Sequence, residues 1–220
     1  MLTIEKHGDV AVLTIDDGKA NVVSEAFSQA INDGLDSALN NAKAVVLKGR
    51  PGRFSAGFDL KVIREGRPEQ ASAMRQAGAR TILRLFMHPQ PVVIACTGHA
   101  LAAGALILLS GDTRIGIRGD FKIGLNETAI GLPLPNWTLE LARARMPVTQ
   151  LTSNIIQAQI HDPHSAVAAG YLDQVVEPEE LTSIAIEKAS QLASSLDGEA
   201  YGIVKHRLRG ASAALIESSL

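Results

Sequence analysis

Strand-like and helix-like patterns alternate along the first 125 residues, and this alternation constrains the fold more than any other feature of the chain. Ala44–Lys48 and Pro91–Cys96 are short apolar runs typical of buried strands. Between them, Pro68–Met87 repeats apolar residues at helical spacing. Such alternation predicts an α/β domain, and the helical patterns that dominate after Pro135 predict a helical C-terminal part.

The remaining elements follow the same rules. Leu2–His7 and Val10–Asp16 flank a Gly8-Asp9 turn and predict a hairpin. After an N-cap at Ser24, the residues Phe27, Ile31, Leu35 and Leu39 mark the inner face of a helix. Further predictions are a Gly- and Pro-rich loop at 49–57, a turn at Gly98, a small-residue helix at 103–110, strands at 113–117, 121–123 and 173–176, and a helix from Pro178 to Leu196.

Composition limits the classes of function. The chain has 220 residues, 46% of them hydrophobic, which is enough for one domain with a sizeable core. A net charge of -2 without a run of Lys or Arg gives no support to binding of nucleic acid or a membrane surface. The single cysteine, Cys96, excludes an internal disulfide and is predicted to be a packed, inert thiol. We therefore expect a cytoplasmic protein.

Several common site motifs are absent or incomplete. No Rossmann or P-loop glycine pattern occurs. Gly52–Gly57 is similar to a serine-hydrolase elbow but has one residue too many before Ser55. His161 and His164 lie close in sequence, but Pro163 breaks the helix that would align them. We expect a solvated loop there, and no metal site.

Two glycine-containing segments, Phe54–Leu60 and Gly98–Gly104, each follow a predicted buried strand. Their small residues allow close approach to the backbone, and the first N–H groups of a following helix lack internal partners. Such groups can donate hydrogen bonds to an anion. The alternative is structural: a tight turn in the first segment and a close helix–sheet contact in the second. The occurrence of two such turns favours paired donors.

Glu127 is the acid most suited to chemistry. It is the only acid between Asp120 and Glu140. Leu125 and Ile130 flank it and indicate a partly buried loop, where burial would raise its pKa toward neutrality. One carboxylate beside an oxyanion site predicts proton abstraction next to a carbonyl group. The alternative is an ordinary solvated surface glutamate.

Other polar residues have structural interpretations. Asp59 is a competing acid, but we predict that it caps a helix beginning near Leu60. Asp112 and Arg114 are predicted to form a structural ion pair. Trp137 belongs either to the core or to a pocket wall.

The two glycine-containing segments and Glu127, with their spacing, resemble the crotonase (enoyl-CoA hydratase/isomerase) superfamily from Leu2 to about Ala200. The resemblance implies a spiral of ββα units over about 1–195 of a single domain (1–220), with a short helical extension at 196–220. It also implies a homotrimer or a dimer of trimers and an acyl-CoA thioester substrate, with no cofactor beyond the coenzyme A of that substrate. The implied oxyanion donors are the N–H groups of Phe58 and Ala103. The implied substrate-binding residues are Ser55, Ala56, Asp59, Leu60, Leu106 and Trp137.

The departures from the family pattern limit which of the family's reactions the resemblance implies. Hydratases of this family carry two catalytic glutamates, and this chain has Leu106 at the first position and Glu127 at the second. Ile123–Thr128 and Pro135–Trp137 resemble mitochondrial-type Δ3,Δ2-enoyl-CoA isomerases, which keep a single glutamate. The implied reaction is isomerisation of 3-enoyl-CoA to 2-enoyl-CoA in fatty-acid β-oxidation. The alternatives are an enoyl-CoA hydratase or thioester hydrolase, and a non-catalytic assembly module with the same fold.

Overall fold

A six-stranded sheet is the larger of two sheets in the computed structural model, which describes residues 1–220. Its first two strands form the predicted antiparallel hairpin, and every later neighbour is parallel. The strand order is β1 (Leu2–His7), β2 (Val10–Ile15), β3 (Ala44–Lys48), β5 (Val92–Cys96), β7 (Thr113–Ile117) and β9 (Gln174–Val176).

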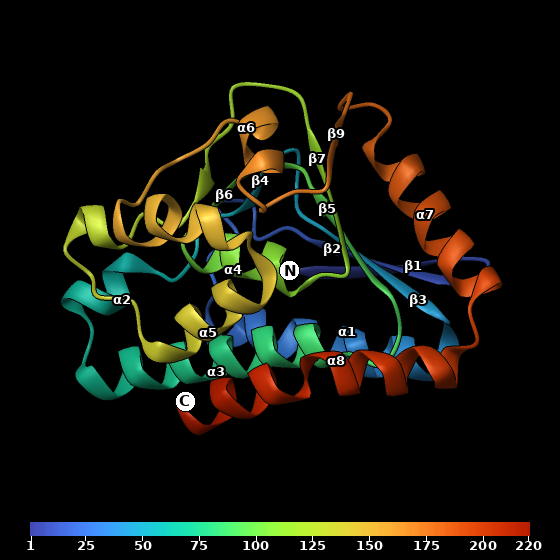
Figure 1. Cartoon of the computed structure of the whole chain (residues 1–220), viewed down its shortest axis with the longest axis horizontal. Coiled ribbons are helices and arrows are strands. Elements are labelled where there is room, and N and C mark those ends of the chain that lie inside the picture. The colour runs from blue at the N-terminus through green and yellow to red at the C-terminus, as the bar shows by residue number, and fades with distance from the viewer.

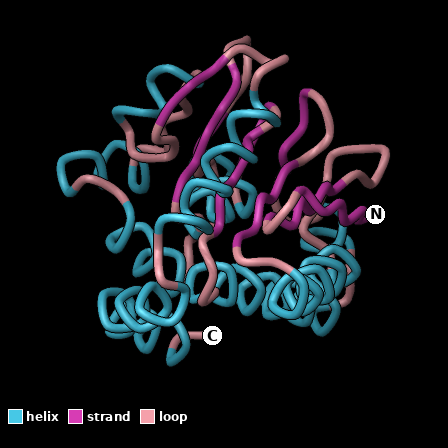
Figure 2. The backbone as a smooth tube through the Cα atoms, turned by 90° about the vertical axis from the view of Figure 1, so that its right-hand side faces the viewer, coloured by secondary structure: helices cyan, strands magenta, loops and turns pink.

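Side chains alternate between the two faces of this sheet, as the two-residue period of a strand requires. In β3, Val45 and Leu47 join the main core, while Ala44 and Val46 join a smaller cluster on the opposite face. Helices α1 (Glu25–Asn41), α3 (Pro68–Met87) and α4 (Ala103–Ser110) supply the main core. Helix α7 (Leu181–Ser195) covers the other face (Figure 1). Figure 2 shows the layer of helices beneath the strands, on the side of the C-terminus.

A second, three-stranded parallel sheet was not predicted. Its strands β4 (Gly52–Ser55), β6 (Gly98–Leu101) and β8 (Ile123–Gly124) lie in the order β4-β6-β8. The predictions of a loop at 49–57 and a turn at Gly98 are therefore wrong in these stretches. Strands this short give little periodic signal, and their pairing partners are remote in sequence. Each follows a strand of the large sheet, which produces the expected repeat of two strands followed by helix.

Most predicted helices are present, with one wrong detail in α1. Ser24 caps this helix, accepting the Phe27 N–H at 3.1 Å. Leu39 is 43% exposed instead of lying on the inner face. A helix makes one turn every 3.6 residues, so the inward-facing residue after Leu35 is Ala38. Leu39, the residue after it, faces solvent.

The C-terminal third is helical, as predicted, and it is not separate from the core. Helix α8 (Gly198–Ser218) packs on α3 and on α5 (Asn136–Arg145), and its residue Ile216 belongs to the main core. No helix is long and apolar enough to cross a membrane. The other helical elements are α2 (Leu60–Glu65), α5 (Asn136–Arg145), α6 (Pro163–Ala168), the 3-10 turns Thr128–Ile130 and Val148–Gln150, and a π-helical turn at Thr152–Ile156.

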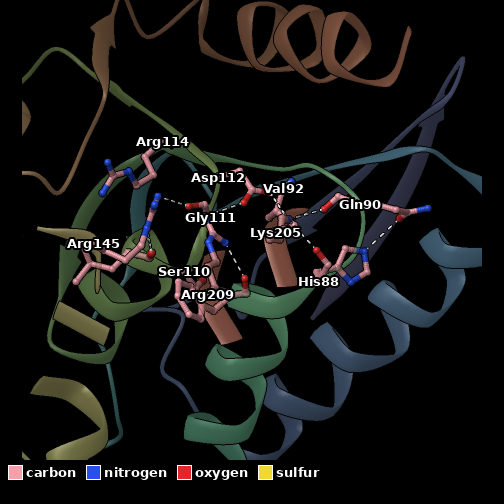
Figure 3. A network of polar contacts seen from close by, with 12 residues as sticks. His88, Gln90, Val92, Ser110, Gly111, Asp112, Arg114, Arg145, Lys205 and Arg209 are labelled. Carbon is pink, nitrogen blue, oxygen red and sulfur yellow. Dashed lines mark hydrogen bonds and ion pairs between the residues drawn. The ribbon is translucent and has the colours of Figure 1, made fainter. Parts of the chain in front are cut away.

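A buried polar network fastens α8 to the ends of α3 and α4 (Figure 3). Asp112 accepts from Lys205 at 2.6 Å and from Arg209 at 2.9 Å. The predicted pair of Asp112 and Arg114 is therefore wrong, because Arg114 bonds instead to Asp173 at 2.6 Å. The two side chains are separated because each pairs with a residue from the C-terminal half. Lys205 of α8 bonds to Asp112, and Asp173, just before β9, bonds to Arg114.

Candidate active site

The carboxyl ends of β4, β6 and β8 bring the predicted catalytic residues to one edge of the smaller sheet. The three strands are parallel neighbours, so their ends lie side by side. Phe58, Ala103 and Glu127 follow within two or three residues of those ends. The Ala102 N–H donates to the Gly124 carbonyl at 3.0 Å, which ties the second donor segment to the segment that carries Glu127.

Gly57 lets the two donor segments touch. Its φ is +83°, a conformation that side chains other than hydrogen rarely allow. A methyl group at this position would lie 2.7 Å from the Ala102 Cβ and 2.9 Å from the Ala103 nitrogen. The backbone leading to Phe58 therefore lies directly against the start of α4, and no larger residue fits there.

Both predicted donor N–H groups are available. The Phe58 N–H donates to no backbone or side-chain acceptor in the protein. Ala103 is the first residue of α4, where an N–H has no acceptor within the helix and lies at the positive end of the helix dipole. Ala102, with φ +52° and ψ -126°, holds a strained conformation for a residue with a Cβ, as residues beside active sites often do. Two free N–H groups on adjoining segments are able to donate hydrogen bonds to an oxyanion.

A buried asparagine that we did not predict supports the first donor segment. Asn21 has φ +50° and is fully buried, and its amide donates to Ile15 O at 3.0 Å and Phe54 O at 3.2 Å. The Ser55 hydroxyl donates to Asn21 O at 2.7 Å and accepts the Gly57 N–H at 3.2 Å. Both of these bonds keep the Ser55 hydroxyl within the loop, and the substrate-binding role of Ser55 stays a prediction. An asparagine after a Gly-containing turn was the available signal.

Glu127 lies in a desolvated position. It directly precedes the 3-10 turn Thr128–Ile130, and its Oε2 is buried without a hydrogen-bond partner. Burial raises its pKa from 4.5 to about 7, although the backbone N–H groups of Glu127 and Asn126 oppose the rise. A carboxyl group with this pKa can both accept and return a proton near neutral pH.

The other predicted site residues divide between surface and core. Asp59 caps α2 by accepting the Lys61 N–H at 2.8 Å, which confirms the structural interpretation. Ala56 and Leu60 are exposed residues of the first donor segment. Leu106 and Trp137 are buried at 1% and 5% exposure, and both belong to the main core.

The candidate metal and thiol positions are structural. His161 is 6% exposed and its Nε2 lies 2.8 Å from Asn154 Oδ1, so a solvated loop is the wrong description. Two 2.9 Å backbone hydrogen bonds with Ile123 draw His161 into the fold. No group of three His, Cys, Asp or Glu side chains is placed to hold a metal ion. Cys96 is buried, and burial raises the pKa of its thiol to about 12, which confirms an inert thiol.

Known proteins share both the sequence and the fold of this chain. Residues 5–218 match the family described as enoyl-CoA hydratase/isomerase. The human mitochondrial enoyl-CoA delta isomerase 1 is 28% identical over 93% of this chain and 68% of its own length. A short-chain-enoyl-CoA hydratase of Clostridium acetobutylicum is 29% identical over 87% of this chain and 75% of its own length. An enoyl-CoA hydratase/isomerase family protein of Pseudomonas syringae, with a solved structure, has a TM-score of 0.96 and 37% identity over 99% of this chain and 94% of that one.

Proposed function

Because the chain belongs to the enoyl-CoA hydratase/isomerase family and has its crotonase fold, we propose that it is a Δ3,Δ2-enoyl-CoA isomerase. An acyl-CoA thioester is the substrate that fits this family. The observation that carries the proposal is the carboxylate of Glu127, whose Oε2 is buried without a hydrogen-bond partner. Its segment is joined to the second donor segment by the Ala102 N–H, and the N–H groups of Phe58 and Ala103 are free. The reaction would serve the β-oxidation of unsaturated fatty acids.

The proposed mechanism uses one base and one oxyanion site. The thioester oxygen accepts hydrogen bonds from the N–H groups of Phe58 and Ala103. Glu127 removes a proton from C2, which gives a dienolate whose negative charge lies on that oxygen. Protonated Glu127 then returns the proton to C4, and the double bond moves from C3–C4 to C2–C3. Each such donor typically contributes about 3 kcal/mol to stabilising the transition state.

Leu106 favours isomerisation over hydration. Addition of water needs a second polar group that positions the water molecule, and Leu106 is an apolar core residue at the position of the first hydratase glutamate. The similar proteins bear isomerase and hydratase names at nearly equal identity, so these names do not separate the two reactions. The residues at the site support the isomerase.

The proposal is tested by assaying purified protein with 3-enoyl-CoA for isomerisation and with 2-enoyl-CoA for hydration. We expect isomerisation to predominate, and Glu127→Gln to reduce it by about 10²–10⁴-fold because the acid and base steps share this group. Acyl-CoA binding by the variant should stay close to wild type, since Gln keeps the shape of Glu. Faster hydration than isomerisation would identify a hydratase. Failure of wild type to bind acyl-CoA would favour the non-catalytic assembly module.

We further propose that the chain forms a homotrimer or a dimer of trimers. The outer side of α8 exposes Val204, Leu208 and Leu215 at 61%, 80% and 54%. Clustered exposed apolar side chains commonly mark association surfaces. Light scattering should give the mass of three or six copies. Leu208→Glu should lower the measured mass, because it places a charge on the association surface. A monomer at micromolar concentration would contradict this proposal.

A further inference from the structure

A hollow lies at the amino ends of the strands of the smaller sheet, opposite to the end that carries the candidate active site. Arg53 and His99 are register partners near the amino ends of β4 and β6, and Phe121 lies just before β8. A strand of four residues such as β4 spans about 10 Å, so the hollow is separate from the edge with Glu127. The hollow has a volume of about 390 Å³ and is lined by Arg50, Pro51, Gly52, Arg53, His99 and Phe121.

The ring of His99 is fixed so that it offers a hydrogen-bond donor. Its Nδ1 accepts the Lys122 N–H at 2.9 Å, and the ring packs edge-to-face on Phe121 with centroids 5.3 Å apart. A neutral imidazole that accepts at Nδ1 carries its proton at Nε2, and this N–H donates to no acceptor in the protein. Burial lowers the pKa of His99. The charges of Arg53 and Lys122 lower it further, against the opposing charge of Asp120. His99 is therefore a neutral donor near neutral pH.

Two arginines line the hollow together with this donor. The side chain of Arg53, the sheet partner of His99, forms no ion pair or hydrogen bond within the protein. The Arg53 N–H donates to the Arg50 carbonyl at 3.0 Å, which holds the two arginines on one turn. The Arg50 guanidinium donates to the Lys19 carbonyl and lies 3.4 Å from Asp16, a long contact for an ion pair. No acidic residue lines the hollow, so its positive charge faces no carboxylate there.

We propose that this hollow binds a phosphomonoester, a small organic molecule with one phosphate group, at a site separate from that of the acyl-CoA substrate. The Arg53 guanidinium and the His99 Nε2–H donate to phosphate oxygens, and Arg50 adds positive charge. A guanidinium can bond two phosphate oxygens at once, which favours phosphate over a spherical anion. The hollow is wider than a phosphate group, and Pro51 and Phe121 provide an apolar wall for the organic part.

Binding of inorganic phosphate and phenyl phosphate tests this assignment without an activity assay, so the outcome does not depend on the proposed isomerase. With the ionic strength held constant by sodium chloride, calorimetry should give saturable binding of both probes to wild type. Phenyl phosphate should bind several-fold more tightly, because its ring contacts the apolar wall. Absence of saturable binding would overturn the proposal. Equal affinity for the two probes would overturn the assignment of an organic phosphate.

Matched arginine variants locate the site. Arg53→Gln removes a charged donor from an exposed position, and we expect it to weaken phenyl phosphate binding about tenfold. Arg75→Gln removes the same charge from an exposed position of α3 that does not line the hollow, and the affinity should stay within about twofold of wild type. Equal weakening by the two substitutions would show that binding follows net charge alone, and the proposed site would be wrong.

The His99 ring reports where the probe binds. In protein with ¹⁵N-labelled histidine, phenyl phosphate should shift the Nε2 resonance that is missing from His99→Ala, because this N–H gains an acceptor. A His99 resonance that does not move at saturating phenyl phosphate would contradict the proposal.

Coenzyme A separates the two sources of a phosphate group. We expect phenyl phosphate to bind wild type equally well with and without coenzyme A, since the hollow and the candidate active site lie at opposite ends of the smaller sheet. Displacement by coenzyme A but not by dephospho-coenzyme A, which lacks the 3′-phosphate, would assign the hollow to the substrate and overturn a separate site.

Discussion

The protein buries two carboxylates in opposite ways. Asp112, at the junction of α3, α4 and α8, accepts from Lys205 Nζ at 2.6 Å, from Arg209 at 2.9 Å and from the Val92 N–H at 2.7 Å (Figure 3). Glu127, at the edge of the smaller sheet, has a buried Oε2 that no group contacts through a hydrogen bond. The first carboxylate is paired with two cations, and the second has no cationic partner and one oxygen without any hydrogen bond.

The difference separates residues that hold the fold from residues suited to chemistry. At the junction, Lys205 also donates to the His88 and Gln90 carbonyls at 2.7 and 3.0 Å. The buried ammonium group therefore satisfies carbonyl groups just past the C-terminal end of α3. At the site, the lone carboxylate and the strained Ala102 both cost stability. A buried acid becomes reactive when the fold withholds its partners, and perturbed acids are for this reason concentrated at functional sites.

The largest effect is expected at the junction. Asp112→Ala leaves Lys205 and Arg209 buried without their counter-ion and should lower the free energy of unfolding by about 3–5 kcal/mol, measured by urea denaturation. The matched control is Glu177→Ala, which breaks an exposed pair with Arg118 and should cost less than about 1 kcal/mol. If Asp112→Ala and Glu177→Ala lowered the free energy of unfolding equally, Asp112 would not be a structural carboxylate distinct from a surface one.

A smaller effect of opposite sign is expected at Glu127. Its folded pKa of about 7 exceeds the ordinary value of 4.5, so the folded state binds the proton more tightly than the unfolded state. This contribution is complete below about pH 4.5 and is lost as pH rises through 7, where the buried carboxylate ionises. Glu127→Gln removes the charge and should stabilise the protein by about 1–3 kcal/mol at pH 8, relative to its effect at pH 5.

The expected stabilisation by Glu127→Gln is checked by the melting temperatures of wild type and variant at about pH 5 and about pH 8. Glu177→Gln, on the exposed surface, serves as the control and should show little pH dependence. A Glu127→Gln effect that is the same at both values would mean that the carboxylate has a partner or a solvated position, and the comparison with Asp112 would fail.

Sequence patterns predicted the elements that repeat over many residues. The strands of the large sheet and helices α3 and α4 lie where their periodicity places them. The short strands β4 and β6 were missed, because their pairing depends on segments more than 40 residues apart in sequence. At the site, Glu127 and the two donor segments were predicted from glycines and flanking apolar residues. Asn21 was missed, because a buried polar side chain is indistinguishable in sequence from an exposed one.

By itself, the sequence determined the α/β class, the two glycine-containing donor segments, the family resemblance and the replacement of one family glutamate by Leu106. These properties follow from local periodicity and from which residue stands at each position. The tertiary structure decided which charges meet, since Asp112 finds cationic partners on α8 and Glu127 has no ion pair. Solvation and hydrogen bonding depend on segments that meet only after folding, so the raised pKa of Glu127 is a property of the assembled fold.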